Sequence, residues 1–168
     1  RFSTNRSIIV AEEYGNDLFE HLNGQFAFAI WDQRKEKLLL GRDRMGIRPL
    51  FYHLKDRRLV FASEIKAIFA DDSVCRQIDH NSLSDVFTCW SAVGANTCFK
   101  DIYQISPGHY ASFSTNGFDI KQYWELPFGK QDYQEQSTSD WVDQLNELLL
   151  EATRIRLRAD VPVGTYLS

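Results

Sequence analysis

Two groups of side chains in this sequence could do chemistry, and their positions limit what that chemistry is. The charged triplet Arg42–Arg44 follows a glycine and could line a site. An aspartate in such a turn more often accepts hydrogen bonds from nearby backbone amides, so we predict a structural turn. The histidines have no common spacing and no acidic partner at a metal-ligand interval, which argues against a metal site or a catalytic histidine. They are His21, His53, His80 and His109.

The cysteines are weak candidates for a nucleophile. Cys75, Cys89 and Cys98 are odd in number and form no CxxC pair, so we predict free or buried thiols in a reducing compartment. All three are internal, and therefore none can use its own backbone amine as a base. A nucleophilic cysteine would need a nearby histidine, whose proximity the sequence does not establish.

Two further groups could bind ligands, and each has a simpler structural interpretation. Tryptophans can form a stacking platform, but we predict that those of this chain pack in a core. They are Trp31, Trp90, Trp124 and Trp141. The arginines at 154, 156 and 158 could meet phosphate, but a charge run of this kind is typical of a solvated helix end.

The segment 22–32, LNGQFAFAIWD, predicts the central element of the fold. Its alternating positions are apolar on both faces, with Phe26, Phe28 and Ile30 on one side and Ala27, Ala29 and Trp31 on the other. A strand of this kind must be covered on both sides, so we expect it at the centre of a layered domain.

The other predicted elements follow from turn and cap signals. Strands are expected at 37–42, 49–54 and 58–63, and a hairpin over 108–124 around the turn Thr115–Gly117. Helices are expected at 8–22, interrupted at Gly15 with a cap at Asn16, at 64–70, and from His80 to Trp90 with Asp79 as N-cap.

The C-terminal part has a different pattern. The polar stretch 129–138 predicts a linker. A helix follows, with Thr138 or Ser139 as its cap and an apolar face at three- and four-residue intervals. That face consists of Trp141, Leu145, Leu148, Leu149, Ala152 and Ile155. The segment 161–167 is predicted to be a buried strand, and we expect this part to fray or aggregate when isolated.

Composition excludes several classes of function. The chain has 168 residues, enough for one core, and a net charge of -4 from 19 basic and 23 acidic residues. Mild acidity argues against nucleic acid as a partner. No apolar run is long enough for a bilayer, so we expect no membrane partner.

Six motifs occur in order along the chain and are specific in combination. They are 22–32 (LNGQFAFAIWD), 41–50 (GRDRMGIRPL), 61–67 (FASEIKA), 105–109 (ISPGH), 123–124 (YW) and 156–168 (RLRADVPVGTYLS). Together they closely resemble glutamine-hydrolysing asparagine synthetases, whose first domain is a class II, N-terminal-nucleophile glutamine amidotransferase. The resemblance implies an α+β fold. Residues 1–128 would form an incomplete four-layer αββα sandwich, and 139–168 the first helix and strand of an α/β ATP-pyrophosphatase domain.

The resemblance also implies a reaction for the full-length protein. Glutamine would be hydrolysed to glutamate and ammonia, and the ammonia transferred to an adenylated aspartate. Glutamine, aspartate and ATP would be the substrates, with Mg²⁺ required, in a cytoplasmic enzyme that could be a homodimer. Leu167 and Ser168 match the start of the family's nucleotide loop and are the only ATP-binding residues that can be assigned. We expect no cofactor on this chain, because the rest of that loop is absent.

Three departures from the family pattern concern the glutaminase site. The family uses an N-terminal cysteine, whereas this chain begins at Arg1 and is expected to be truncated at both ends. An upstream Asn-Gly-Glu stretch is also missing, and a Ser-Asp-Thr-Glu tetrapeptide is absent after Asn5. No catalytic or glutamine-binding residue can therefore be assigned, and we expect the chain as given to be inactive.

Three alternatives to an asparagine synthetase remain. A related amidotransferase could act on another carboxylate, since the acceptor site lies in the missing domain. The chain could also be a non-catalytic glutaminase-like module. A proteasome-like N-terminal hydrolase is disfavoured by the segment 161–168.

Overall fold

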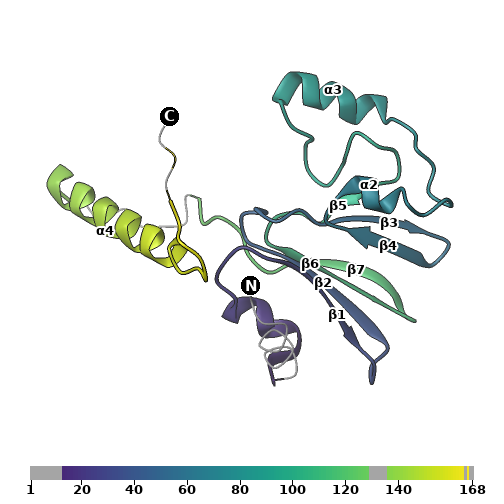
Figure 1. The fold of residues 1–168 in the computed structure, drawn as a ribbon, viewed down its shortest axis with the longest axis horizontal. Helices are drawn as coiled ribbons and strands as arrows, with labels where there is room; N and C mark the ends of the chain where they lie inside the picture. Colours follow the sequence, from purple (N-terminus) through teal and green to yellow (C-terminus); the bar gives the residue numbers. More distant parts are fainter. Residues whose placement is uncertain (1–12, 129–135, 165, 167–168) are drawn as a thin grey trace. The chain divides into compact units, whose positions relative to one another are not determined.

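The computed structural model describes residues 13–128, 136–164 and 166 (Figure 1). The chain divides into two compact units, Arg1–Leu126 and Pro127–Ser168. The first unit is an α+β arrangement with two antiparallel sheets, as the sequence predicted at this level. The described residues of the second unit contain one long helix.

The larger sheet has four strands in the order β1-β2-β6-β7, all antiparallel. Its strands are β1 (Ala27–Asp32), β2 (Lys37–Arg42), β6 (His109–Ser114) and β7 (Gly117–Gln122). The predicted hairpin is confirmed as β6–β7. Ser114 pairs with Gly117, so a two-residue loop joins the strands, and Gly117 has a φ of 123°.

The smaller sheet has the order β4-β3-β5. Its strands are β3 (Phe51–Lys55), β4 (Arg58–Ala62) and β5 (Tyr103–Gln104). Asp56 and Arg57 form the β3–β4 turn with φ values of 49° and 60°, the conformation whose twist suits a two-residue hairpin. The sequence did not predict β5, because two residues are too short for a periodic signal.

Three apolar clusters order the first unit into layers. Leu40 and Ala111 of the larger sheet pack with Tyr52 of the smaller one, so this cluster lies between the sheets. The outer face of the larger sheet packs against Phe19 of the 3₁₀ helix η1 (Gly15–His21). The outer face of the smaller sheet packs against Ile68 of helix α2 (Ile65–Ile68). The order is therefore η1, sheet, sheet, α2.

The strand β1 is less covered than its sequence predicted. Phe28 and Ile30 pack on the η1 side and Ala27 on the inter-sheet side, which confirms the alternation. However, β1 is an edge strand whose ladder partner among the described residues is β2, and Trp31 is 57% exposed. Ala29, on the same side, is exposed as well, so the prediction that the strand is buried on both faces is wrong for the side that carries Ala27, Ala29 and Trp31.

The core prediction for tryptophan also fails elsewhere. Trp90 ends helix α3 (His80–Cys89) in the left-handed conformation and is 93% exposed, and Trp141 is 46% exposed. Trp124 is partly buried.

The N-cap of α3 agrees with the prediction, because the Asp79 carboxylate accepts a hydrogen bond from the Ser82 amide at 2.9 Å.

The first helical segment differs from its prediction. Residues 8–12 lie outside the described residues. Glu13 and Tyr14 are α-helical, as predicted, whereas the part after them is the 3₁₀ helix η1. The N-cap is Tyr14, which makes no side-chain cap bond, and Asn16 lies inside the element rather than at its start. Gly15, with a φ of 57°, lies where the α-helical residues end and η1 begins, which confirms the predicted interruption at this position.

In the second unit, helix α4 spans Thr138–Arg156. Its N-cap is Ser137, one residue before the predicted caps. The Ser137 hydroxyl accepts from the Asp140 amide, and the Asp140 carboxylate accepts from the Ser137 amide, forming a capping box. The predicted apolar face is exposed, with Leu145 at 57% and Leu148 at 69%.

The strand predicted at 161–167 is not present in the described residues of that segment, 161–164 and 166. A strand needs a neighbour to complete its backbone hydrogen bonds, and the described part of this unit supplies none. Thr165, Leu167 and Ser168 lie outside the described residues.

Candidate functional site

Three of the six motifs meet at Asp43, at the end of β2. Its buried carboxylate, 1% exposed, accepts hydrogen bonds from the backbone amides of Phe26, Ile47 and Arg48, at 3.2, 2.9 and 2.9 Å. The Asp43 amide donates to the Phe26 carbonyl at 2.9 Å, and the Asp43 carbonyl accepts from Gly108 at 3.1 Å. One aspartate therefore joins segments that are distant in the chain.

The side chain of Arg42 also joins segments of the chain, by donating hydrogen bonds to their carbonyl groups. Its Nε donates to the Arg48 carbonyl at 3.0 Å and Nη2 donates to the Gly46 carbonyl at 2.8 Å. Nη1 donates to the Ile105 carbonyl at 2.5 Å and to Gln104 Oε1 at 3.0 Å. Burial lowers the pKa of Arg42, an effect that the neighbouring Asp43 carboxylate opposes.

A fourth motif, residues 123–124, contacts the same region. The Tyr123 hydroxyl donates to the Arg42 carbonyl at 2.7 Å, and the Tyr123 and Trp124 amides both donate to the Gly108 carbonyl. Gly108 has a φ of +68°, and a Cβ there would lie 2.4 Å from the Trp124 carbonyl oxygen. Burial and the nearby Asp43 carboxylate raise the pKa of Tyr123 to about 12, while Arg44 opposes the rise.

This arrangement, which we call the Arg42–Asp43 hub, is structural. Apart from the bond of Arg42 to the Gln104 side chain, both side chains direct their polar atoms at backbone groups, so they are committed to holding four chain segments together. The prediction of an aspartate-held turn is confirmed. Arg44 is different: its Nε is the one buried side-chain nitrogen or oxygen among the described residues that has no hydrogen-bond partner.

The other candidates are dispersed. The Nδ1 atoms of His53 and His109 lie 2.8 Å from backbone carbonyls of Asp101 and Pro107. Cys75 and Cys89 are exposed and Cys98 is partly buried, all as free thiols. Leu167 and Ser168, assigned by resemblance to ATP, lie outside the described residues.

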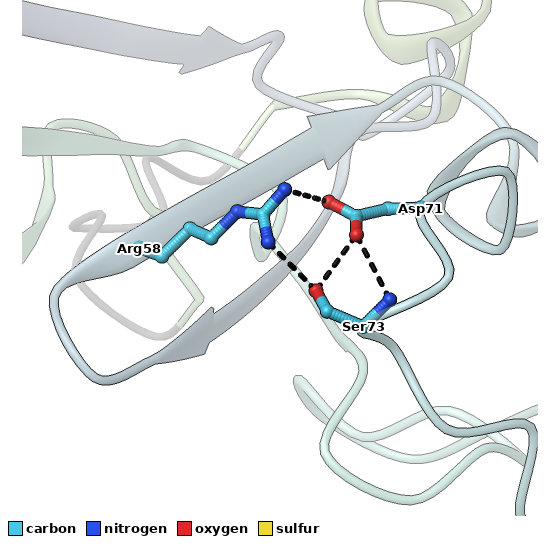
Figure 2. Close-up of polar contacts among 3 residues, drawn as sticks. All are labelled: Arg58, Asp71 and Ser73. Carbon is cyan, nitrogen blue, oxygen red and sulfur yellow. Dashed lines mark hydrogen bonds and ion pairs between the residues drawn. The ribbon is translucent and has the colours of Figure 1, made fainter.

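Sequence reasoning missed one polar cluster. Arg58 of β4 reaches the turn after α2, where Nη2 lies 2.6 Å from Asp71 Oδ2 and Nη1 donates to Ser73 Oγ at 2.9 Å (Figure 2). The Asp71 carboxylate also accepts from the amide and hydroxyl of Ser73, at 3.0 and 2.7 Å. Those two bonds, and less strongly the Arg58 charge, lower the pKa of Asp71. These residues are 13 and 15 positions apart, with no periodic pattern to connect them.

Across residues 13–128, 136–164 and 166, no group of three or more His, Cys, Asp and Glu side chains could hold a metal ion. Within the same residues, none of the helices has the length and apolar character needed to cross a membrane.

Comparison with known proteins identifies the class. Residues 4–124 match the family model described as a glutamine amidotransferase domain, and the chain belongs to that family. It is 38% identical to asparagine synthetase [glutamine-hydrolyzing] 3 of Bacillus subtilis (strain 168), over 93% of this chain and 25% of the relative. The Bacillus subtilis asparagine synthetase [glutamine-hydrolyzing] 2 is 35% identical, over 94% of this chain and 22% of the relative.

A fungal protein is similar to a comparable degree. Amidase chry2 of Gibberella zeae is 36% identical, over 96% of this chain and 24% of the relative. The chain thus spans about a quarter of the length of the curated relatives that it matches.

Proposed function

We propose that this chain is most of a class II glutaminase domain in an ATP-dependent ligase of the asparagine synthetase type. In that reaction, glutamine is hydrolysed to glutamate and ammonia, and the ammonia displaces AMP from an adenylated aspartate. The layered core inside the matched residues carries the proposal. Its order of η1, sheet, sheet and α2 is the order expected for an αββα N-terminal-nucleophile sandwich.

The second unit is proposed to begin the ATP-pyrophosphatase domain. A 19-residue helix whose Leu145, Leu148 and Leu149 are exposed is typical of an element that packs against further structure. Leu167 and Ser168 would open the nucleotide loop, with ATP and Mg²⁺ bound by the full-length protein. The 168 residues alone are proposed to bind neither, because the rest of that loop is not among them.

The reaction itself is proposed to need a residue outside the Arg42–Asp43 hub. Cys75, Cys89 and Cys98 are all internal, and an N-terminal nucleophile must use its own α-amino group as base. A polypeptide of these 168 residues should therefore release no ammonia from glutamine.

Two alternatives have specific support. A different acceptor is considered because the chain is about as similar to a protein named as an amidase as to the proteins named as asparagine synthetases. A non-catalytic glutaminase-like module is favoured by the tetrapeptide missing after Asn5.

The gene sequence upstream of Arg1 separates the enzyme from the non-catalytic module. A Met-Cys start in the reading frame supports the enzyme, whereas another residue after the methionine supports the module. If the protein is an enzyme, the product of the whole gene should release ammonia from glutamine. It should form AMP from ATP only when the carboxylate acceptor is present. AMP formation with aspartate supports an asparagine synthetase. Its absence with aspartate, together with its presence with another carboxylate, supports the other acceptor.

A further inference from the structure

A pocket lies on the outer face of the smaller sheet, at the β3–β4 hairpin, away from the Arg42–Asp43 hub. It has a volume of about 270 Å³, and its walls come from the hairpin and from the turn after α2. Its lining residues are His53, Lys55, Asp56, Arg58, Val60 and Ser73. His53 pairs with Val60 and Lys55 with Arg58 across the two strands, so these four side chains share one face of the hairpin.

His53 is the buried polar group of this pocket. It is 7% exposed, and its Nδ1 lies 2.8 Å from the Asp101 carbonyl oxygen. A carbonyl can only accept, so Nδ1 carries the proton of the neutral ring and Nε2 is left as an acceptor. Nε2 has no hydrogen-bond partner within the described residues. Among the described residues, Arg44 Nε is the one side-chain nitrogen or oxygen that is both shielded from solvent and without a hydrogen-bond partner. His53 Nε2, which also lacks a partner, must therefore keep some access to solvent, and His53 lines the pocket.

Arg58 supplies fixed donors. Its guanidinium is held from one side by Asp71 and Ser73, as Figure 2 shows, which uses two of its five N–H groups. Three N–H groups remain for a ligand. A guanidinium that is already fixed loses less conformational freedom when it binds an anion.

The pocket is lined by both positive and negative side chains, and this limits the chemical class of ligand that fits it. Arg58 is already paired with Asp71 at 2.6 Å. Lys55 and Asp56 are both exposed and have no side-chain partner within the described residues. The pocket therefore combines surplus N–H donors with two acceptors, the Asp56 carboxylate and His53 Nε2. The exposed Asp56 carboxylate can keep its hydrogen bonds to water, but the buried His53 Nε2 needs a donor from the ligand. A fully deprotonated oxyanion would satisfy the N–H donors but would meet His53 Nε2 with a bare lone pair.

We propose that this pocket binds hydrogen phosphate. The anion has three oxygens that can accept from Arg58 and Lys55, and one P–OH group that can donate to His53 Nε2. Sulfate has the same shape and charge as the hydrogen phosphate dianion but has no proton to donate, so the site should discriminate between them. This inference is independent of the proposed function, because it uses none of the residues assigned to glutamine or ATP.

The test is an NMR titration of the full 168-residue chain at slightly alkaline pH and constant ionic strength. Inorganic phosphate should cause saturable shifts of the His53 Nε2 resonance and the Ser73 amide, with a dissociation constant of about 1 mM. Sulfate should bind at least about tenfold more weakly, the effect of one lost hydrogen bond. Equal affinities for the two anions, or shifts that never saturate, would overturn the proposal.

Variants locate the effect. His53→Asn keeps a donor near the Nδ1 position for the Asp101 carbonyl but removes the pocket-facing nitrogen, and it should abolish the preference for phosphate. Lys55→Gln is exposed and should fold normally, weakening phosphate about tenfold, while Asp56→Asn should strengthen sulfate. The control Lys35→Gln removes an exposed lysine from the turn between β1 and β2 and should leave phosphate binding unchanged. Unchanged phosphate binding in Lys55→Gln would contradict the proposal even if His53→Asn failed to fold.

Discussion

The side chains of Arg42 and Gln104 join the hub to a loop that is distant in sequence. Arg42 Nη1 donates to Gln104 Oε1 at 3.0 Å, and Gln104 Nε2 donates to the Gly94 carbonyl at 2.7 Å. The Gln104 backbone amide also donates to the Ala95 carbonyl at 2.8 Å. One amide side chain thus connects the end of β2 with the loop that precedes β5.

This connection predicts coupling between the two residues. Gln104→Leu should lower the free energy of unfolding by about 1–2 kcal/mol, because the Gly94 carbonyl and one bond of Arg42 lose their partner. A double-mutant cycle with Arg42→Lys should give an interaction energy of about 1 kcal/mol in urea denaturation. Additive effects of the two substitutions would show that Gln104 does not act through Arg42.

Two glycines offer a matched test of whether stability depends on the close contact between Gly108 and the Trp124 backbone. Gly94 and Gly108 have nearly equal φ values, +67° and +68°, but only a Cβ at Gly108 meets another atom within 4 Å. Gly94→Ala should cost about 1 kcal/mol for the left-handed conformation alone. Gly108→Ala should cost at least about 2 kcal/mol more, since the Trp124 backbone must move. Similar melting temperatures for the two variants would mean that the approach of Trp124 is not required.

The cap of α4 can be tested against the position that the sequence suggested. Ser137→Ala removes the hydroxyl that accepts a hydrogen bond from the Asp140 amide, but keeps the Ser137 backbone amide that donates to the Asp140 carboxylate. It should lower the stability of the helix by about 1 kcal/mol. Thr138→Ala should have little effect, because Thr138 is the first helical residue and not the cap. Amide exchange over the first turn of α4 in the full chain measures both. Greater loss of protection in Thr138→Ala would favour the cap expected from sequence.

Local signals in the sequence predicted most of the fold. The strands 37–42 and 58–63, the β6–β7 hairpin and the Asp79 cap were recognised because each depends on neighbours within a few residues. Contacts between distant segments were not. The exposure of Trp31 follows from the edge position of β1, and β5 forms only because β3 pairs with it.

The same division applies to the candidate sites. Turn chemistry alone predicted that Asp43 would hold backbone amides. It did not predict that Phe26, Gly108 and Tyr123 would meet there, because that depends on the register of β2 with β6. The pocket at His53 had no sequence signal, since its walls come from two segments with no shared period.

Tyr123 makes stability depend on alkaline pH. Its pKa of about 12 in the folded chain exceeds the ordinary value of about 10. The folded state therefore holds the proton more tightly, and this contribution is fully present below about pH 10 and is lost as the pH rises towards 12. The pKa difference of Tyr123 corresponds to about 3 kcal/mol of stability for a fully buried group. Because Tyr123 is partly exposed, we expect the free energy of unfolding to fall by about 1–2 kcal/mol over this pH range.

Tyr123→Phe should remove this part of the pH dependence. It should also cost about 1 kcal/mol at neutral pH, where the hydrogen bond to the Arg42 carbonyl is lost. Tyr166→Phe is the control, because Tyr166 is 96% exposed. Urea denaturation at several pH values checks both variants. An unchanged alkaline slope in Tyr123→Phe would show that another group, such as Tyr52, whose pKa is also raised by burial, accounts for it.

The central claim is that the family motifs within this chain build its framework rather than perform its chemistry. Urea denaturation of Asp43→Asn against Asp32→Asn tests it most directly. The Asp32 carboxylate accepts hydrogen bonds from two exposed backbone amides at 3.0 Å, whereas the buried Asp43 carboxylate accepts hydrogen bonds from three backbone amides. We predict a loss of about 2–4 kcal/mol for Asp43→Asn and under about 1 kcal/mol for Asp32→Asn. Equal, small losses in the two variants would contradict the claim.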